Sequence, residues 1–510
     1  MLEGAGPQLL RQWIARAAAR DPDKAFIIAA DDGRTLSFGQ LRDVTGRIAA
    51  YLWDKKIVAN DRIALLSNNS IEHLAAYFGV MAYGAAICTV HVEMNRNQLD
   101  NILPVLKPRM VLCEDGLGLD DILKAASAPC MALGSWDDRR GDSFFAAVNA
   151  CEPSDVSAEA GADDSAVILF TSGTSARPKG VVLSFRELLS NAGPTADGFN
   201  LTAQDRIYDF RSFNWCSAQT LSALPPLCRG ATLILGRKFS RSRFFDHIKT
   251  HGATIATGNP TTVGILLNGD ALALPELPML RFMTSSSAPL LVDEWRRFED
   301  RFGIRIAQGY GCSEIGWIAA QPGEQRRIGT VGRPHGYHQL SVVGPEGQSL
   351  KTGEMGAVEL GGLRGNAFRT LADDGSLRVD CHDRMKTGDL GFLDDEGHLH
   401  LTGRAKDLII RGGVNISPLE IDGILMRCTD VIEACTVGVP DKVYGEEVVA
   451  YVVLRPGSTL AAADVLRHCA RLLPAFKTPK HVVPSDELPK TERGKLDRKL
   501  LVERWTRNAR

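Results

Sequence analysis

A dense run of hydroxyl, glycine and lysine residues is the first feature of this chain that indicates chemistry. The run reads Phe170-Thr-Ser-Gly-Thr-Ser-Ala-Arg-Pro-Lys-Gly180 and lies between two apolar runs. Hydroxyl groups and backbone donors in a strand-to-strand turn, with the point charge of Lys179, are suited to holding phosphate oxygens. It is not a Walker A loop, because the lysine precedes the second glycine and no helix follows. A serine-rich surface turn is the alternative, but it does not account for ten specified positions in order.

A second cluster carries a carboxylate suited to a metal ion. Gln308-Gly-Tyr-Gly-Cys-Ser-Glu-Ile-Gly316 follows Thr284-Ser-Ser-Ser-Ala-Pro-Leu290. Glycines beside Tyr310 permit a flat base to lie against the backbone, and Glu314 supplies the hard oxygen ligand that Mg²⁺ requires beside a triphosphate. Standing alone, this motif is weak evidence.

A carboxylate in a tight turn marks a third cluster. In Lys386-Thr-Gly-Asp-Leu-Gly391, Asp389 is placed to accept both hydroxyls of a ribose, one on each oxygen. An isolated Thr-Gly-Asp is a plain β-turn, so its meaning depends on the motif that follows. That motif is Gly403-Arg-Ala-Lys-Asp-Leu-Ile-Ile-Arg-Gly-Gly-Val-Asn-Ile-Ser-Pro-Leu-Glu420, in which paired glycines let a bound group approach the main chain closely.

A basic run near the C-terminus, Pro489-Lys-Thr-Glu-Arg-Gly-Lys-Leu-Asp-Arg498, completes the set. A basic tail is normally only a solvated face. Here a glycine turns the chain so that Lys495 can project into a site. An ammonium group held in a site would offset negative charge on reacting groups there.

In this order the motifs resemble those of the adenylate-forming superfamily, which includes acyl-CoA synthetases, hydroxycinnamate–CoA ligases, peptide-synthetase adenylation domains and firefly luciferase. The match extends from about residue 10 to residue 505. The resemblance implies ATP, Mg²⁺ and coenzyme A as cofactors. The nucleotide-binding positions that it implies are Thr171, Ser172, Gly173, Thr174, Ser175, Ser287, Gln308, Gly309, Tyr310, Ser313, Asp389 and Arg404.

The resemblance also implies roles for individual groups around the nucleotide. Lys179, Glu314 and Lys495 would be catalytic, with Glu314 as the ligand of Mg²⁺. Tyr310 and the Ser287-Ala288 backbone would sandwich the adenine.

Further along the chain, the resemblance implies a ribose contact and a hinge. Asp389 and Arg404 would bind the ribose together, and Lys406 occupies the family's hinge position. Gly412 and Gly413 belong to the segment that would line the coenzyme A channel. For Lys406 alone, a solvated lysine at a domain boundary is the simpler alternative.

The chain departs from the family pattern at a few positions. Ser175-Ala176 stands where Thr-Gly is usual, and Ser313 replaces a threonine but keeps the hydroxyl. Asn214 occupies a position where many ligases place a histidine beside the acyl site. None of these changes removes a reacting group.

The acid pocket is expected around Asn214, Cys216, Thr220 and Trp317. Bulky tryptophans and a serine-rich strand end predict a short pocket. We therefore expect a small or medium monocarboxylic acid, although Arg211 leaves a second carboxylate open.

Charge and cysteine usage narrow the class of protein. Lys and Arg total 59 against 61 for Asp and Glu, which gives no electrostatic reason to expect nucleic acid or an anionic membrane as a partner. The 11 cysteines form neither a CxxC pair nor a metal-ligand pattern, which is typical of a reducing, cytoplasmic setting. Leu74 to Val90 is uncharged, but it is short for a membrane span, and we expect Gly79 and Gly84 to break it into a buried helix followed by a strand.

The pattern of apolar runs predicts an α/β fold. β-branched runs alternate with helix-length stretches such as 71–83 and 292–302, which predicts mostly parallel sheets in two subdomains. After about residue 330, short strands with Gly-centred turns predict a small, partly antiparallel β subdomain. We expect an adenylation domain over 1–403 and a mobile α+β C-terminal domain over 404–510.

The resulting hypothesis is an ATP-dependent carboxylic acid–CoA ligase that forms an acyl-adenylate and then a thioester. A stand-alone adenylation enzyme that loads a carrier-protein thiol, a luciferase-type oxidative enzyme and a non-catalytic nucleotide sensor are the alternatives. We expect a monomer or homodimer without stable membrane insertion, acting on a small carboxylic acid. Because the first step depends on its charge, Lys495 is also a candidate target for a lysine acetyltransferase and deacetylase.

Overall fold

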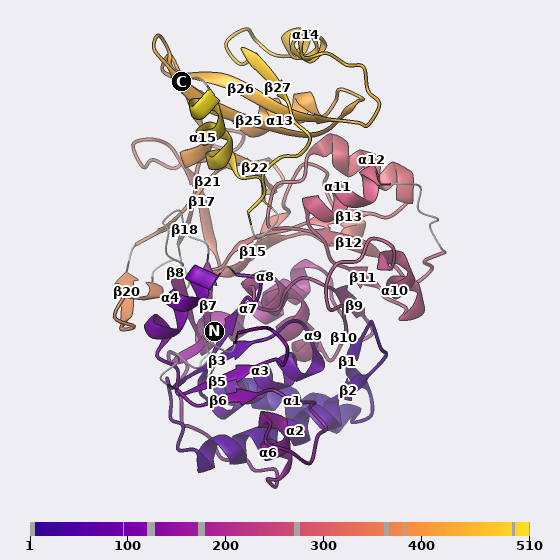
Figure 1. The fold of residues 1–510 in the computed structure, drawn as a ribbon, viewed down its shortest axis with the longest axis vertical. Helices are drawn as coiled ribbons and strands as arrows, with labels where there is room; N and C mark the ends of the chain where they lie inside the picture. Colours follow the sequence, from indigo (N-terminus) through magenta and orange to yellow (C-terminus); the bar gives the residue numbers. More distant parts are fainter. Residues whose placement is uncertain are drawn as a thin grey trace.

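Two mixed sheets surrounded by helices form the larger, N-terminal part of the protein (Figure 1). The computed structural model describes residues 6–94, 96–119, 128–171, 179–269, 276–361, 367–381, 383–491 and 495–508. The eight-stranded sheet has the order β20-β19-β8-β7-β4-β3-β5-β6, and its strands are β3 (Arg62–Leu66), β4 (Ala86–Val90), β5 (Met110–Cys113), β6 (Cys130–Ala132), β7 (Ser165–Thr171), β8 (Lys179–Ser184), β19 (Ala367–Leu371) and β20 (Leu377–Cys381). The seven-stranded sheet has the order β13-β12-β11-β9-β10-β1-β2, and its strands are β1 (Ala25–Ala29), β2 (Thr35–Ser37), β9 (Arg206–Asp209), β10 (Thr232–Leu235), β11 (Ile255–Ala256), β12 (Phe282–Ser285) and β13 (Ile306–Gln308).

Both sheets are parallel in their middle, as the alternating apolar runs predicted. In the eight-stranded sheet β7, β4, β3, β5 and β6 pair in parallel, and antiparallel pairing begins at β8. In the seven-stranded sheet every pair is parallel except that of β1 with β2. The α/β class is therefore confirmed.

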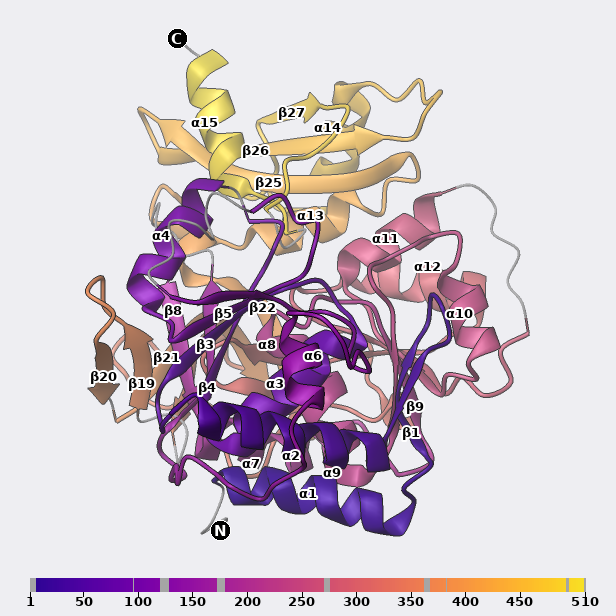
Figure 2. The same cartoon turned by 60° about the horizontal axis from the view of Figure 1, so that its bottom comes forward.

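Helices cover these sheets. They are α1 (Pro7–Arg20), α2 (Phe38–Asp54), α3 (Ile71–Tyr83), α4 (Arg96–Leu106), α6 (Phe144–Asn149), α7 (Phe185–Gly198), α8 (Cys216–Ala218), α9 (Leu224–Arg229), α10 (Phe244–Thr250), α11 (Pro260–Asn268) and α12 (Val292–Phe302), with the π-turn η1 (Gln219–Ala223) and the 3₁₀ turn η2 (Gly323–Gln325). Figure 2 shows α1 and α2 side by side, and the two helices are in contact.

Helix α3 lies between the two sheets, because it contacts β1 of one and β3 and β4 of the other. All of its residues are buried, and it ends at Gly84, whose φ of 107° is the left-handed conformation of a helix C-cap. The expected buried helix followed by a strand is thus present. The expected break at Gly79 is wrong: this glycine lies within the helix, where a Cβ atom would come 2.3 Å from Ile48 of α2. No helix in the described residues is long and apolar enough to cross a membrane.

Antiparallel strands follow, as the Gly-centred turns predicted. β14 (Tyr310–Cys312), β15 (Gly316–Ala320) and β16 (Arg333–Pro334) form a three-stranded sheet, and β17 (Gln339–Val343), β18 (Gly356–Gly361), β21 (Met385–Leu393) and β22 (Leu399–Arg404) form a four-stranded one. A buried cluster that includes Tyr310, Ile318, Val358 and Leu399 joins these two sheets.

The C-terminal part is built on its own five-stranded sheet, drawn in yellow and light orange in Figure 1. Its strands are β23 (Ile409–Arg411), β24 (Val414–Ile416), β25 (Val431–Asp441), β26 (Gly445–Leu454) and β27 (His481–Pro484), and it carries α13 (Pro418–Leu425), α14 (Ala462–Leu472) and α15 (Arg498–Asn508). The sheet changes between β22 and β23, at the 3₁₀ turn η3 (Ala405–Asp407). The boundary between residues 403 and 404 stays a proposal.

The two parts touch through α12. The Arg427 guanidinium after α13 donates to the Asp293 carboxylate at the start of α12, with an N–O distance of 2.8 Å. Leu291 packs against the apolar cluster of the C-terminal sheet, which includes Ile421 and Val431. These contacts fix one arrangement of the two parts in this structure.

Candidate functional site

The carboxyl ends of β9, β11, β12 and β13 form the floor of the candidate site. These strands run parallel, so the segments that follow them meet at one edge of the sheet. Such an edge is where open α/β sheets bind ligands. It collects the segments after Asp209, Ala256, Ser285 and Gln308, which include the predicted adenine-binding and acid-binding positions.

Tyr310, Asp389 and Arg404 are brought together from three separate motifs. The Asp389 carboxylate accepts a hydrogen bond from the Tyr310 hydroxyl on one oxygen and from Arg404 Nε on the other, at 2.8 Å. Strand register explains the second contact, because Asp389 on β21 pairs directly with Arg404 on β22. Burial, and the nearby Asp389 carboxylate, raise the pKa of Tyr310, so the phenol stays protonated and donates. Asp389 is buried and Arg404 is exposed, which leaves this pair at the site's surface.

Glu314 lies in the tight turn between β14 and β15, where it is half-buried, and Ser313 precedes it in the same turn. No cluster of three or more acidic, histidine or cysteine side chains able to hold a metal occurs in the part of the chain that the structure describes. One carboxylate is nevertheless the donor set that fits Mg²⁺, which usually takes one or two carboxylates and completes its shell with water and substrate phosphates.

The hydroxyl-, glycine- and lysine-rich run of residues 170–180 connects β7 to β8, and it therefore joins two strands as predicted. The two strands pair antiparallel, and the register places Thr171 opposite Lys179 at the mouth of the loop. Lys179 is exposed there as the first residue of β8. Ser172, Gly173, Thr174 and Ser175 lie outside the described residues.

Ser287 has an unusual backbone. Its φ is 72°, in the left-handed region that non-glycine residues adopt at a cost of about 1 kcal/mol. The side chain is exposed, and the following peptide is fixed because Gln308 Nε2 donates to the Ala288 carbonyl at 3.1 Å. The strained turn therefore holds the Ser287-Ala288 backbone against the end of β13, where the adenine is predicted to bind.

The predicted acid-pocket residues Asn214, Cys216 and Thr220 are buried together around α8. The Asn214 amide nitrogen donates to the Ser67 carbonyl at 2.9 Å, whereas Asn214 Oδ1 is buried without a hydrogen-bond partner among the described residues. A π-turn follows, in which the Leu224 amide donates to the Gln219 carbonyl. The next two residues are prolines, which have no amide hydrogen to donate within the helix. Helix α8 contacts β14 and β15, which brings this segment to Glu314 and Trp317.

Trp317 is buried, and its place beside the acid stays a prediction. Its indole packs edge-on against Phe199, with ring centroids 5.3 Å apart, within an interior apolar cluster. A Cβ atom at Gly309 would come 2.5 Å from this indole. Packing against Trp317 thus explains why residue 309 is a glycine. The sequence interpretation had attributed this glycine to the close approach of a base.

The sequence interpretation missed a buried ion pair beneath the pocket. Arg211 donates through Nε and Nη2 to the Asp209 carboxylate, with the shortest N–O distance at 2.6 Å, and both side chains are almost fully buried. Asp209 also accepts from Ser222 at 2.6 Å and from Thr257 at 2.7 Å. Arg211 Nη1 donates to the Ser286 hydroxyl at 3.2 Å. The Asp-Phe-Arg spacing at the end of the short apolar run that forms β9 was the available signal.

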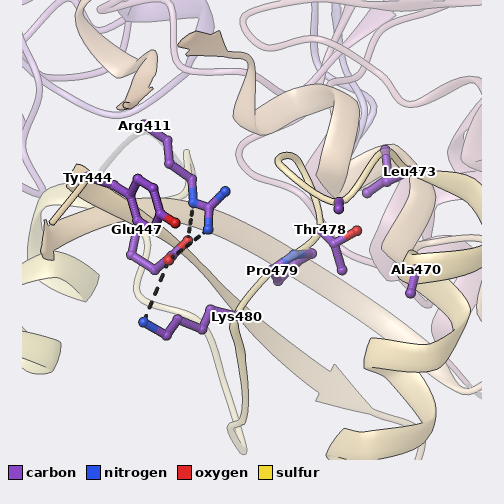
Figure 3. Close-up of a pocket in the computed structure, with 9 residues that line it drawn as sticks. Arg411, Tyr444, Glu447, Ala470, Leu473, Thr478, Pro479 and Lys480 are labelled. Atoms are coloured by element: carbon purple, nitrogen blue, oxygen red, sulfur yellow. Dashed lines mark hydrogen bonds and ion pairs between the residues drawn. The ribbon is translucent and has the colours of Figure 1, made fainter. Parts of the chain in front are cut away.

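A separate pocket of about 470 Å³ opens on the C-terminal sheet (Figure 3). Arg411 pairs with Glu447 and lies over the ring of Tyr444, with its guanidinium carbon 4.5 Å from the ring centroid. Lys480 reaches Glu447 at 3.7 Å, and Thr478 and Pro479 line the wall. Gly412 and Gly413 have φ values of 56° and 83°, and they form the two-residue turn between β23 and β24. Positive φ at both positions requires glycine, so the hairpin itself explains this pair.

The two remaining predicted lysines, Lys406 and Lys495, belong to the linking turn and to the C-terminal part of the chain. Lys406 is exposed in η3, the turn that joins the two parts. Lys495 is exposed, and its carbonyl accepts a hydrogen bond from the Thr491 amide at 2.7 Å.

Comparisons with known proteins agree with this geometry. The family described as AMP-binding enzyme matches residues 14–366, and AMP-binding enzyme C-terminal domain matches residues 420–495. The chain is 33% identical over 501 residues to sulfoacetate–CoA ligase of Cupriavidus necator, covering 97% of each chain. It is 32% identical to indoleacetate–CoA ligase of Aromatoleum aromaticum, covering 98% of this chain and 99% of the relative.

A solved structure of the same fold exists in two states. The chain superimposes on ATP-bound MatB of Rhodopseudomonas palustris with a TM-score of 0.87 at 28% identity, over 98% of this chain and 100% of that one. Against the apo form of the same protein the TM-score is 0.76. The whole chain therefore superimposes better on the ATP-bound form than on the apo form.

Proposed function

Because the chain belongs to the AMP-binding enzyme family of adenylate-forming ligases and is an AMP-forming acyl-CoA synthetase, we propose that the Tyr310–Asp389–Arg404 cluster holds the nucleotide for this reaction. The observation that carries the proposal is the Asp389 carboxylate, which receives hydrogen bonds from both of the other side chains. Its two oxygens are the acceptors that two ribose hydroxyls require. Tyr310 and the Ser287-Ala288 backbone flank the same edge of the sheet and bind the adenine.

The enzyme uses ATP, Mg²⁺ and coenzyme A. In the first half-reaction an oxygen of the substrate carboxylate attacks the α-phosphorus of ATP, which forms an acyl-adenylate and releases pyrophosphate. In the second, the sulfur of coenzyme A attacks the acyl carbon, and AMP leaves. Mg²⁺ would be held by Glu314 and would neutralise phosphate charge. This chain contributes positioning and charge, because neither step requires a protein nucleophile.

The pocket on the C-terminal sheet is the proposed binding site for the nucleotide end of coenzyme A. Tyr444 is 45% exposed and Phe476 is 41% exposed beside Lys477 and Arg411. Exposed aromatic faces with flanking cations suit a base and its phosphates. The CoA-ligase relatives favour this cofactor over a carrier-protein thiol.

The acid that fits best is small and carries one carboxylate. The charge of Arg211 is already neutralised by Asp209, so a second anion at the pocket floor would face a buried carboxylate. The side chain of Ser286 fills part of this floor and is held by Arg211. Both features support a short acid, aliphatic or monocyclic.

A short acid with a second anionic group is the other candidate, and one contact favours it. Arg211 Nη1 donates toward Ser286, away from Asp209, and an anion that displaced the serine hydroxyl would reach the same guanidinium edge. Of the two relatives described above, one is named for an acid with a second anionic group and the other for an acid with a single carboxylate and a bicyclic ring, so they support neither candidate over the other.

A panel of acids tests both the site and the substrate. Pyrophosphate release and CoA-dependent AMP formation should occur with short monocarboxylic acids, while C16 acids and malonate-type diacids should be poor substrates. Glu314→Ala should lower pyrophosphate release by about a hundredfold or more while the fold is retained. The reason is that the Mg²⁺ ion beside the triphosphate would lose its carboxylate ligand. A folded Glu314→Ala protein with wild-type pyrophosphate release would remove Glu314 from the site.

A further inference from the structure

Strand β20 is the outer edge of the eight-stranded sheet, and its composition is unusual for an edge. Within the described residues it pairs only with β19, and Figure 2 shows the two strands side by side at the margin of the molecule. All five of its residues are exposed, including Leu377 at 45% and Val379 at 46%. Natural proteins protect such an edge with charged side chains of one sign, above all lysine, or with proline or a bulge; β20 has no lysine, proline or bulge, and its two charges are of opposite sign.

The two faces of β20 differ in a regular way. Side chains alternate along a strand, so Leu377, Val379 and Cys381 point to one face, and Arg378 and Asp380 point to the other. Neither Arg378 nor Asp380 is ion-paired within the described part of the chain. The strand therefore presents an apolar face and a face with one charge of each sign.

This sequence is complementary to itself. If a second copy paired antiparallel with Val379 opposite Val379, then Arg378 would lie opposite Asp380 of the partner, and Asp380 opposite the partner's Arg378. On the other face Leu377 would lie opposite the partner's Cys381. Opposite charges directly across an antiparallel pair stabilise it, and like charges there destabilise it.

We propose that β20 is a dimerisation strand, which pairs with β20 of a second copy about a two-fold axis through Val379. Two eight-stranded sheets then become one continuous sheet. The interface is isologous, so it closes at the dimer. Pairing of β20 with the opposite edge, β6, would be head-to-tail and would grow without limit, but β6 has only three residues and offers no charge complement.

Charge reversal tests the proposed register. Sedimentation of the full chain at about 1 to 100 µM should show a monomer–dimer equilibrium, since a five-residue strand buries less area than a permanent interface. Arg378→Glu or Asp380→Arg should weaken the dimer about tenfold or more, because each places two like-charged pairs across the axis. The double variant Arg378→Asp/Asp380→Arg should restore association to within about threefold of wild type.

Three results would overturn the proposal. In the first, the wild-type chain stays monomeric at every concentration in the sedimentation series. In the second, Arg378→Glu and Asp380→Arg both dimerise as strongly as wild type. In the third, the wild-type chain forms species larger than a dimer. Ligase activity should be the same in all variants, since β20 carries no residue placed in the site, and it reports that each variant is folded.

Crosslinking tests the axis directly. In a Cys130→Ser/Cys381→Ser background, Val379→Cys should give a disulfide-linked dimer under mild oxidation, because antiparallel partners lie within the Cα separation of a disulfide. Leu377→Cys in the same background is the matched control, since the two copies of residue 377 would be about 13 Å apart and cannot bond. Restoring Cys381 beside Leu377→Cys should bring the crosslink back. Equal crosslinking of Val379→Cys and its control would overturn the register.

Discussion

At the residue scale, the structure separates positions that serve a ligand from positions that serve the fold. Gly309, Gly412 and Gly413 are explained by an indole and by a hairpin turn. Ser287 is the opposite case, because a serine stands where the backbone would favour glycine. Strain that persists at a predicted adenine contact is a reason to expect function there.

Replacing this serine should therefore stabilise the protein. Ser287→Gly should raise the free energy of unfolding by about 0.5–1 kcal/mol, because glycine adopts a φ of 72° without steric cost. Differential scanning fluorimetry would measure the shift in Tm. Ser286→Gly is the neighbouring control, and it should destabilise the protein by about 1 kcal/mol, because Arg211 loses a hydrogen-bond acceptor.

The same control variant predicts a change in the acid pocket. Ser286→Gly removes a hydroxymethyl group from the proposed pocket floor, so kcat/KM should rise for acids one or two carbons longer than the best wild-type substrate. Ser287→Gly, whose altered side chain is exposed, should leave the order of preference unchanged. An acid panel read by AMP formation makes the comparison, and an unchanged order in Ser286→Gly would remove this residue from the pocket.

These residues also show how far sequence reasoning reached within the site. Asp389 and Arg404 were predicted as partners from two separate motifs, and strand register places them opposite each other. The Asp209–Arg211 pair was missed, because its meaning depends on burial and on Ser222, Thr257 and Ser286, which no local pattern connects to it. Trp317 was predicted to adjoin the pocket from its position next to a motif, whereas its contact with Phe199 could not be predicted, because the direction of a side chain on a strand is decided by register.

At the element scale, helices and strands with a clear period were predictable, and close packing was not. The periodic stretches 71–83 and 292–302 are α3 and α12 to the residue. Gly79 was read as a break because a glycine in a helix is unfavourable in isolation. Its reason is the approach of Ile48 from α2, a contact between elements that the local sequence does not contain.

Helix α12 carries a carboxyl group that should make stability depend on pH. Burial, together with Glu433 on β25, raises the pKa of Glu294 to about 7, although Arg297 on the same helix opposes the shift. Glu433 in turn pairs with Lys490. Because the folded state holds this proton more tightly than the unfolded state, stability is highest below the ordinary glutamate pKa of about 4.3 and falls as pH rises toward 7.

Glu294→Gln should remove this dependence. The variant should match wild type near pH 4.5 and be more stable by about 1–2 kcal/mol at pH 8, a value reduced for the partial exposure of the side chain. Urea unfolding at a series of pH values measures the difference. Asp300→Asn, at an exposed position of the same helix, is the control and should show no such trend. A difference that does not grow with pH would contradict a raised pKa at Glu294.

At the scale of the whole molecule, we expect the arrangement of the two parts to decide which half-reaction is possible. The Asp293–Arg427 ion pair and the packing of Leu291 hold the present arrangement, and the whole chain superimposes better on an ATP-bound relative than on its apo form. In it, the coenzyme A pocket proposed around Arg411 and Tyr444 belongs to the C-terminal sheet, whereas the nucleotide cluster belongs mostly to the larger part. A rotation about η3 would exchange the C-terminal surface that faces the site.

Two lysines of the C-terminal part should therefore affect different half-reactions. Lys495→Ala should lower acyl-adenylate formation by about a hundredfold to a thousandfold, because a positioned cation no longer offsets the repulsion between carboxylate and phosphate. Transfer of the acyl group from chemically supplied acyl-adenylate to coenzyme A should be largely retained. Lys406→Pro, which restricts backbone rotation in η3, should do the reverse and spare pyrophosphate release while it lowers thioester formation.

Controls separate charge and backbone effects from loss of structure in this last experiment. Lys499→Ala removes a lysine that is 81% exposed on α15 and should leave both half-reactions unchanged. Lys406→Ala removes the side chain but not the rotation, so it should retain more thioester formation than Lys406→Pro. Pyrophosphate release and single-turnover thioester formation are measured separately for each folded variant. If Lys495→Ala and Lys406→Pro lost both half-reactions to the same extent, rotation about η3 would have to be abandoned, while the ligase reaction itself would stand.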